Sequence, residues 1–447
     1  MPAKPALSGA ILPPPALYSA LAVELRDTAC VRPYERNPRK NDQAVDAVAA
    51  SLKEFGFRQP IVVDGDGVII AGHTRYKAAL KLGLSQIPVH VATDLTPEQI
   101  KAYRIADNKS AEIAEWDFEI LPIEIAELQE VGFDLDLLAF NEKELTQLLN
   151  VNVRQGLTDP DEVPEPPDEP TTRRGDIWRL GEHRLMCGDS ANPADLDKLL
   201  DGHSIQMCHT DPPYGVALES RSNNAIAAGL SSFPAQEGAK TTGKMRAKDR
   251  PLANDNLSEA DFEQKLDSWF NNIARVLEPG RAAYIWGGYA NLANYPQKFK
   301  KNGLYWSQCL IWNKMHPVMN RKDFLSCYEL CFYCWREGAA HKFFGPNNER
   351  DLWEVKKEPS RRTVHPTQKP TELATRAIQL SSKPGENVLE LFGGSGSTLI
   401  ACEQTGRKCF AMEIDEAFCD VIVQRWAEFT GKEPIPIPAN DGESNED

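Results

Sequence analysis

The sequence predicts an α/β protein in which a mostly parallel sheet is covered on both faces by helices, with a smaller α+β domain in front of it. Two observations predict this class. Apolar strands alternate with amphipathic helices in the rear of the chain, and an acidic, proline-rich stretch at residues 151–175 divides it. At 447 residues the chain also exceeds one ordinary core. We therefore expect domains at 1–150 and 176–432, joined by a solvated linker at 151–175 and followed by an acidic tail at 433–447.

In the front domain, Gln59–Leu84 predicts a strand, a tight turn at Asp64–Gly67, a second strand and a helix. Helical periodicity follows in Thr96–Trp116 and Leu121–Gly132. The segment order strand–turn–strand–helix indicates a small mixed domain with a helical extension.

In the rear domain, Gly175–Ser190 predicts a hairpin and Ser204–Thr210 a buried strand. A polar stretch at 215–256 precedes an amphipathic helix at Phe262–Leu277, and Arg281–Gly288 is again apolar enough for a buried strand. This alternation is typical of a sheet with crossover helices.

The formal net charge of −15 is concentrated in two stretches, because six acids lie in Leu157–Pro170 and four in the last eight residues. By contrast, Pro296–Pro370 holds fourteen Lys and Arg against seven Asp and Glu. This local basic excess is the electrostatic footprint that phosphate binding requires, although an ordinary solvated surface remains an alternative.

No apolar run reaches the length of a membrane span, and three prolines interrupt Ile11–Leu25, so we expect neither a membrane anchor nor a signal peptide. The ten cysteines lack the regular spacing of a secreted disulfide scaffold, which indicates a cytosolic protein. Cys327, Cys331 and Cys334 have the spacing of a radical-enzyme iron–sulfur motif. On a strand, however, Cys331 and Cys334 point to opposite faces, so we expect core cysteines and no metal.

Glu386–Gly406 combines an apolar strand, a glycine-rich turn and a helix. Gly393, Gly394 and Gly396 allow a sharp turn and a close approach to a ligand, while the helix start offers free N–H groups. Glu413 ends the next strand, where an acid typically binds ribose hydroxyls. This pair of features predicts a nucleotide-containing cofactor, with dinucleotides still included.

A second chemical signal follows the buried strand that ends at Thr210. Asp211 is a hydrogen-bond acceptor, Pro212 and Pro213 stiffen the backbone, and Tyr214 offers a flat ring.

Together these segments resemble the amino-group DNA methyltransferases, in the permuted class whose catalytic motif precedes its S-adenosylmethionine motif. Asp211–Tyr214 (DPPY) matches the catalytic tetrapeptide, Phe392–Gly396 (FGGSG) the cofactor loop, His365–Pro370 (HPTQKP) the segment before it, and Cys187–Ser190 (CGDS) the adenine-side segment. Glu390, where many relatives have Asp, is a conservative departure. The resemblance implies S-adenosylmethionine as cofactor and Rossmann-like folding of this domain. It implies these site residues: catalytic Asp211, Pro212, Pro213 and Tyr214; cofactor-binding Asp189, Thr367, Lys369, Phe392, Gly393, Gly394, Gly396 and Glu413.

The resemblance further implies double-stranded DNA as the partner and a flipped base as the target, with Tyr214 stacking on it. Adenine N6 is favoured over cytosine N4 because relatives acting on cytosine more often have Ser where Asp211 stands. We expect target recognition within residues 289–363 and a DNA-ordered loop at 215–256, a disordered insert being the alternative. The target sequence, a homodimer and a restriction endonuclease partner remain open, as does a non-catalytic DNA-binding regulator.

Residues 20–110 resemble the ParB/sulfiredoxin-like fold, as found in prokaryotic and phage-borne proteins. Gly72–Arg75 (GHTR) stands where relatives have a Gly-x-x-Arg element for nucleotide phosphates. This implies a nucleotide or phosphate at Gly72, His73 and Arg75, with a scaffold or DNA-docking role as the alternative.

Overall fold

The computed structural model describes residues 22–111, 113–114, 116–118, 120–150, 153–215, 223–227, 241, 257–318, 323–356 and 368–438. Thr367, most of the polar stretch at 215–256 and the end of the acidic tail therefore lie outside the described residues. The chain divides into two compact units, residues 1–142 and residues 143–447, and each is considered by itself.

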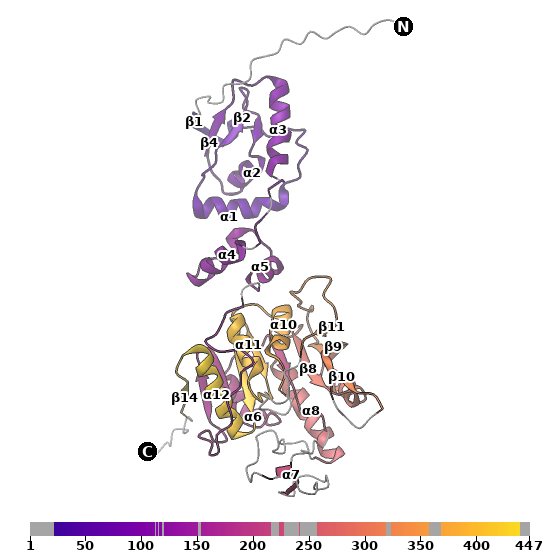
Figure 1. The fold of residues 1–447 in the computed structure, drawn as a ribbon. Helices are drawn as coiled ribbons and strands as arrows, with labels where there is room; N and C mark the ends of the chain where they lie inside the picture. Colours follow the sequence, from indigo (N-terminus) through magenta and orange to yellow (C-terminus); the bar gives the residue numbers. More distant parts are fainter. Residues whose placement is uncertain are drawn as a thin grey trace, which may run out of the picture. The chain divides into compact units, whose positions relative to one another are not determined.

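The first unit contains a four-stranded sheet in the order β1-β4-β2-β3 (Figure 1). Its elements are β1 (Val23–Asp27), α1 (Val45–Phe55), β2 (Ile61–Val63), β3 (Ile69–Ala71), α2 (His73–Lys81), β4 (Gln86–Val91), α3 (Pro97–Ala111) and α4 (Leu121–Glu130). The predicted strand, turn, strand and helix are all present. The turn is stabilised because Asp64 Oδ1 accepts bonds from the N–H groups of Asp66 (3.1 Å) and Val68 (2.9 Å).

The second unit is built on a ten-stranded sheet in the order β11-β9-β10-β8-β7-β12-β13-β6-β5-β14. Its strands are β5 (Ile177–Leu180), β6 (His183–Cys187), β7 (Met207–Thr210), β8 (Ala282–Gly287), β9 (Leu304–Val318), β10 (Ser326–Arg336), β11 (Leu352–Glu354), β12 (Asn387–Glu390), β13 (Lys408–Glu413) and β14 (Ile435–Ile437). The run β8-β7-β12-β13-β6 is parallel throughout, whereas β10 joins β8, and β5 joins β6, in antiparallel fashion. The predicted α/β class is confirmed, with antiparallel additions at both sides.

Helices cover both faces of this sheet (Figure 1). One face packs on residues of α10 (Thr371–Ser381), α11 (Ser397–Thr405) and α12 (Glu416–Thr430), and the other on residues of α6 (Pro193–Leu200), α8 (Glu259–Val276) and α9 (Tyr295–Lys301). Because both faces are covered, a central strand such as β13 is buried along nearly its whole length, rather than alternating between buried and exposed residues. The remaining helices of the unit are α5 (Glu142–Leu149) and α7 (Asn223–Ala227).

The cysteine-rich segment forms β10, and its alternation separates the thiols as expected. Cys331 belongs to the core on the α10–α12 face, Cys334 belongs to the core on the α8 face, and Cys327 is exposed. These three thiols therefore do not converge on one cluster.

The acidic segment before β5 differs from the expected solvated linker, because it binds to the surface of the second unit. The Leu157 N–H donates to the Phe429 carbonyl (2.8 Å), and the Asp161 carboxylate accepts from the Thr371 N–H at the start of α10 (2.7 Å). Helix α5 likewise belongs to this unit, since the Gln147 side-chain amide donates to a backbone carbonyl near α10. The expected tail also begins as a strand, because β14 pairs with β5. Acidic composition alone did not reveal these backbone pairings.

Among the helices of the described ranges, none is both long enough and apolar enough to cross a membrane.

The docking of the acidic segment can be tested through Asp161. Replacement by Ala removes the acceptor for an N–H at the start of α10, so Asp161→Ala should destabilise the second unit by about 1 kcal/mol. Urea unfolding monitored by tryptophan fluorescence would measure the change. Glu165→Ala, an exposed acid of the same segment, is the control and should leave the midpoint unchanged. Equal midpoints for both variants would mean that this segment is not docked.

Candidate active site

The candidate site lies where the carboxyl ends of neighbouring parallel strands meet. Thr210 ends β7, Glu390 ends β12, and Glu413 ends β13. Parallel pairing of β7 with β12 and of β12 with β13 places these ends at one edge of the sheet. Loops that leave this edge are the usual location of ligands in open α/β sheets.

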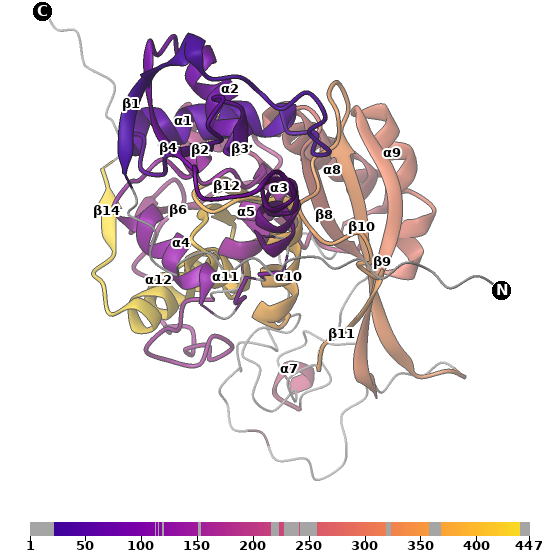
Figure 2. The ribbon, with the colours of Figure 1, turned by 90° about the horizontal axis from the view of Figure 1, so that it is seen from above.

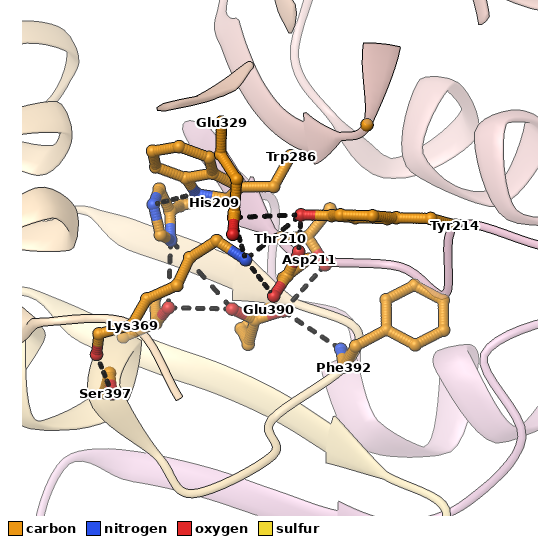
Figure 3. Close-up of polar contacts among 12 residues, drawn as sticks. His209, Thr210, Asp211, Tyr214, Trp286, Glu329, Lys369, Glu390, Phe392 and Ser397 are labelled. Carbon is orange, nitrogen blue, oxygen red and sulfur yellow. Dashed lines mark hydrogen bonds and ion pairs between the residues drawn. The ribbon is translucent and has the colours of Figure 1, made fainter. Parts of the chain in front are cut away.

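The tetrapeptide after β7 forms a compact hydrogen-bonded group (Figure 3). The Tyr214 hydroxyl donates to Asp211 Oδ1 at 2.8 Å, and the Lys369 ammonium donates to Asp211 Oδ2. Pro212 is buried and Pro213 half-buried. Burial raises the pKa of the Asp211 carboxyl, while the Lys369 charge opposes that rise.

Lys369, which the sequence predicts to bind the cofactor, also has contacts that the sequence did not predict. Its Nζ contacts Asp211 and lies 3.2 Å from the Tyr214 hydroxyl. Burial lowers the pKa of the Lys369 ammonium, but the opposing charges of Asp211 and Glu329 outweigh burial and raise the pKa overall. The Lys369 side chain is thus a cation in contact with Asp211 and Tyr214, the two residues that the sequence predicts to be catalytic.

Glu390 connects the two chemical segments. Its carboxylate accepts bonds from the hydroxyls of Thr210 and Thr398, both at 2.7 Å, and from the Phe392 N–H at 2.9 Å. Burial nevertheless dominates and raises the pKa of Glu390 to about 8.

His209 extends this network to the other side of β7. Its Nδ1 lies 2.9 Å from the Thr398 hydroxyl, and its Nε2 accepts from the Trp286 indole at 3.1 Å. An Nε2 that accepts must be unprotonated, so the ring is the neutral Nδ1–H tautomer. Burial, assisted by the Lys369 charge, lowers the pKa of His209 to about 3.

The glycine-rich loop has the conformation that its residues predict. Gly394 and Gly396 have positive φ of 51° and 88°, and α11 starts directly after Gly396. A Cβ on Gly393 would lie 2.9 Å from Ile422 Cδ1, so a larger residue here would require that side-chain end to shift. Ser397 at the helix start donates through its hydroxyl to the Lys369 carbonyl at 3.0 Å, which links the loop to the catalytic group.

The two acids predicted to bind the cofactor lie near this loop. Glu413 accepts from the N–H groups of Gly394 (2.7 Å), Ile414 (2.8 Å) and Asp415 (2.9 Å), and burial raises its pKa to about 7. The Gly188 N–H donates to the Glu413 carbonyl at 2.9 Å, which brings the segment of Asp189 alongside. Asp189 itself forms an ion pair with Lys265 at 3.1 Å.

Sequence reasoning did not place Glu329 and Lys314 beside Asp211 and Lys369; both lie in the region expected to recognise the target. Glu329 lies on β10 with one carboxylate oxygen 3.5 Å from Lys369 Nζ and the other 2.5 Å from Lys314 Nζ on β9. A usable signal was present, because Glu329 is an acid inside the otherwise apolar stretch Cys327–Cys334.

The part of the chain that the structure describes contains no group of three His, Cys, Asp or Glu side chains placed to hold a metal ion.

A separate pocket of about 670 Å³ lies in the first unit. It is lined by Gly72, His73 and Arg75 together with Arg39, Lys40 and Arg58, so the three predicted residues do come together. The Arg75 guanidinium donates to the carbonyls of Gln59 (2.7 Å) and Pro60 (3.0 Å). Burial, aided by nearby cations, lowers the pKa of His73 to about 4, so this ring is neutral.

These features define an α/β domain with a glycine loop and an acceptor-rich catalytic group at one sheet edge. Residues 205–424 match the DNA methylase family, residues 22–108 match the ParB N-terminal domain, and residues 119–174 match the ParB-methyltransferase helix-turn-helix domain. The chain therefore combines a DNA methylase domain with two ParB-type domains, which supports a DNA methyltransferase activity. The recognised combination is confirmed, but the helix-turn-helix was not predicted: its residues were assigned to a helical extension and a linker.

Two curated bacterial relatives are similar to this chain. The Type II methyltransferase M.HpaI of Haemophilus parainfluenzae is 25% identical over 276 residues, which are 57% of this chain and 77% of that protein. The Type II methyltransferase M.HinfI of Haemophilus influenzae is 23% identical over 250 residues, covering 52% of this chain and 65% of that protein. Among solved structures, the M1.HpyAVI–SAM complex has 19% identity and a TM-score of 0.40, covering 54% of this chain and 97% of that one.

The raised pKa of Glu390 predicts a pH dependence of stability. Because its folded pKa of about 8 exceeds the unfolded value of about 4.5, the folded state retains the proton, and stability falls as pH rises between those values. Glu390→Gln should flatten this decline, whereas Glu428→Gln, an exposed acid on α12, should preserve it. Urea midpoints measured across this window would check the prediction, and an identical decline in all three proteins would contradict it.

Proposed function

We propose that this DNA methyltransferase transfers a methyl group from S-adenosylmethionine to adenine N6 in double-stranded DNA. The observation that carries the proposal is the Asp211–Tyr214–Lys369 group, which lies beside the glycine-rich loop at one edge of the sheet. The hydrogen-bond acceptor for the target amine and the loop for the cofactor thereby lie together, although their segments are about 180 residues apart in the sequence.

The residues at the loop fit S-adenosylmethionine. Glu413 accepts three N–H donors, yet a carboxylate offers about four lone-pair sites, so it retains capacity for a ribose hydroxyl. The Trp269 indole N–H is buried without a partner, and its ring packs edge-on against Phe392 at 5.0 Å between centroids. A buried donor without a partner beside this loop is consistent with a polar ligand that satisfies it.

The bound cofactor supplies an electrophilic methyl group. Asp211 then provides the acceptor for the amino hydrogens of the target base, which favours positive charge on the attacking nitrogen. The rigid Pro212 and Pro213 hold that acceptor in place, and Tyr214 provides a ring on which the flipped base stacks. As the nitrogen–carbon bond forms and the sulfur–carbon bond breaks, one amino proton leaves, and in this proposal the Asp211 carboxylate accepts it.

The preference for adenine rests on Asp211, because relatives that act on cytosine more often have Ser at this position. Nucleoside analysis of DNA methylated by the purified protein distinguishes the two bases. N6-methyladenine is expected, and N4-methylcytosine alone would overturn this assignment while leaving the DNA methyltransferase intact.

Two substitutions should separate catalysis from cofactor binding. Asp211→Ala should slow single-turnover methylation at least about 10²-fold, because a charge-assisted acceptor in the site is lost, while affinity for S-adenosylmethionine changes little. Gly394→Val should weaken cofactor binding, because a β-branched residue disfavours the positive φ at this position. Rapid-quench methylation and calorimetric cofactor binding of both variants would show the contrast. A wild-type rate for Asp211→Ala would exclude this mechanism.

We also propose that the first unit binds a nucleotide in its pocket of about 670 Å³. The pocket is lined by four cationic side chains that can donate hydrogen bonds to phosphates: Arg39, Lys40, Arg58 and Arg75.

Equilibrium binding of the four nucleoside triphosphates to the full chain tests the proposal. Arg75→Ala should weaken that binding at least about tenfold, since a charge-assisted bond is lost, without changing single-turnover methylation at saturating DNA. Arg26→Ala is the control, because that arginine lies on β1 and does not line the pocket. Absence of binding by the wild-type chain would leave the scaffold role.

A further inference from the structure

Four charged side chains from four separate segments alternate in sign across the catalytic group. Asp211 follows β7, Lys369 precedes α10, Glu329 lies on β10, and Lys314 lies on β9. Lys369 contacts Asp211 and lies 3.5 Å from Glu329, whose other oxygen pairs with Lys314 at 2.5 Å. Figure 3 shows Lys369 between the two carboxylates.

Both lysines are almost completely buried, because the side chain of Lys369 is 9% exposed and that of Lys314 is 7% exposed. A buried ammonium is stable only when it is paired with an opposite charge. Two anions and two cations balance each other here, so removing one of them leaves an unpaired charge.

In this arrangement Asp211 is already bonded to internal donors. One oxygen accepts from Tyr214 and the other from Lys369. Two of the roughly four lone-pair sites of this carboxylate are thus taken, and Lys369 competes with the target amine for the Oδ2 atom. An ammonium that stayed there would also oppose the positive charge that develops on the attacked nitrogen.

Glu329 offers the ammonium an alternative partner without requiring it to become exposed. Its Oε2 lies 3.5 Å from Lys369 Nζ and also 3.5 Å from the Tyr214 hydroxyl. Strand geometry fixes this position: Glu329 directly precedes Leu330, which is the first residue of β10 that pairs with β8, and Glu329 lies opposite Trp312 on β9.

We propose that Glu329 is a positioning residue for methyl transfer, which draws the Lys369 ammonium away from Asp211 when the target amine binds. This inference rests on the proposed function of Asp211. Lys314 holds Glu329 in place, and Lys369 keeps the Asp211 carboxylate paired until DNA arrives. Asp211 then offers its Oδ2 atom without a competing ammonium only when a base is present.

Several other groups face this cluster, and together they define its response to pH. They are Tyr214 on the catalytic loop, His209 on β7, Glu390 on β12, Tyr295 on α9 and Cys331 on β10. His209 is neutral, and burial raises the pKa of Tyr295 and Cys331 well above their ordinary values, so those groups carry no charge near neutral pH. Burial is the main cause of the raised pKa of Asp211, and the Glu329 charge raises that pKa further, in opposition to Lys369.

The test is Glu329→Gln in the full chain, with Glu337→Gln as the matched control, because Glu337 is an exposed acid just beyond β10. Single-turnover methylation of duplex DNA at saturating cofactor is measured across pH. Glu329→Gln should be at least about tenfold slower at neutral pH, because Lys369 then has only Asp211 as a charged acceptor. The rate should fall at acidic pH as Asp211 becomes protonated, and this fall is the acid limb of the profile. Loss of the Glu329 charge lowers the pKa of Asp211, so the acid limb should move to lower pH. Glu329→Asp should retain the wild-type limb.

Cofactor binding by calorimetry verifies that Glu329→Gln is folded, and its affinity should equal that of the wild type. A wild-type rate and acid limb in Glu329→Gln would overturn the inference, as would a slower rate with an unmoved limb, which indicates a merely structural role. If the wild-type chain itself does not methylate DNA, the proposed function fails instead.

Discussion

The hydrogen bonds of the buried Glu390 side chain are the interaction on which this edge of the sheet depends. Its oxygens accept hydrogen bonds from the hydroxyls of Thr210 at the end of β7 and Thr398 on α11, and from the Phe392 N–H. One buried side chain thereby connects the strand that leads to Asp211 with the loop that starts at Phe392. The mutual position of acceptor and cofactor loop is then set by three short hydrogen bonds and not by flexible surface contacts.

The parallel pairing of β7, β12 and β13 allows Glu390 to reach both segments. Because β7, β12 and β13 run in the same direction, their carboxyl ends and the loops that follow lie at one edge. The antiparallel addition of β10 has a different consequence, since it brings Glu329 to the end of β8 from the opposite direction. From that point β9 and β10 extend past the end of β8 (Figure 2). The catalytic group therefore combines a site typical of a parallel sheet with charges supplied by an antiparallel hairpin.

Burial has opposite effects on the titratable groups of this edge. It raises the pKa of Glu390 and Glu413, to about 8 and about 7, and lowers the pKa of His209 to about 3. A neutral His209 can both accept from Trp286 and bond to Thr398, which a protonated ring cannot do. Lys369, by contrast, retains its charge because two carboxylates surround it. Among the described residues, Lys369 is the only cation in contact with Asp211, and the charges of Asp211 and Glu329 keep it protonated.

The sequence by itself determined the fold class, the order of the motifs and the pairing of Asp211 with a glycine loop, because periodicity and local backbone chemistry are encoded in neighbouring residues. The strand ends, the turn at Asp64 and the separation of Cys331 from Cys334 could be predicted for the same reason. Only the tertiary structure decided that Lys369 contacts Asp211, that Glu329 and Lys314 belong to the site, and that Asp161 binds at the start of α10. Those contacts join residues between 15 and 210 positions apart, and they depend on strand order and register, which no local pattern encodes.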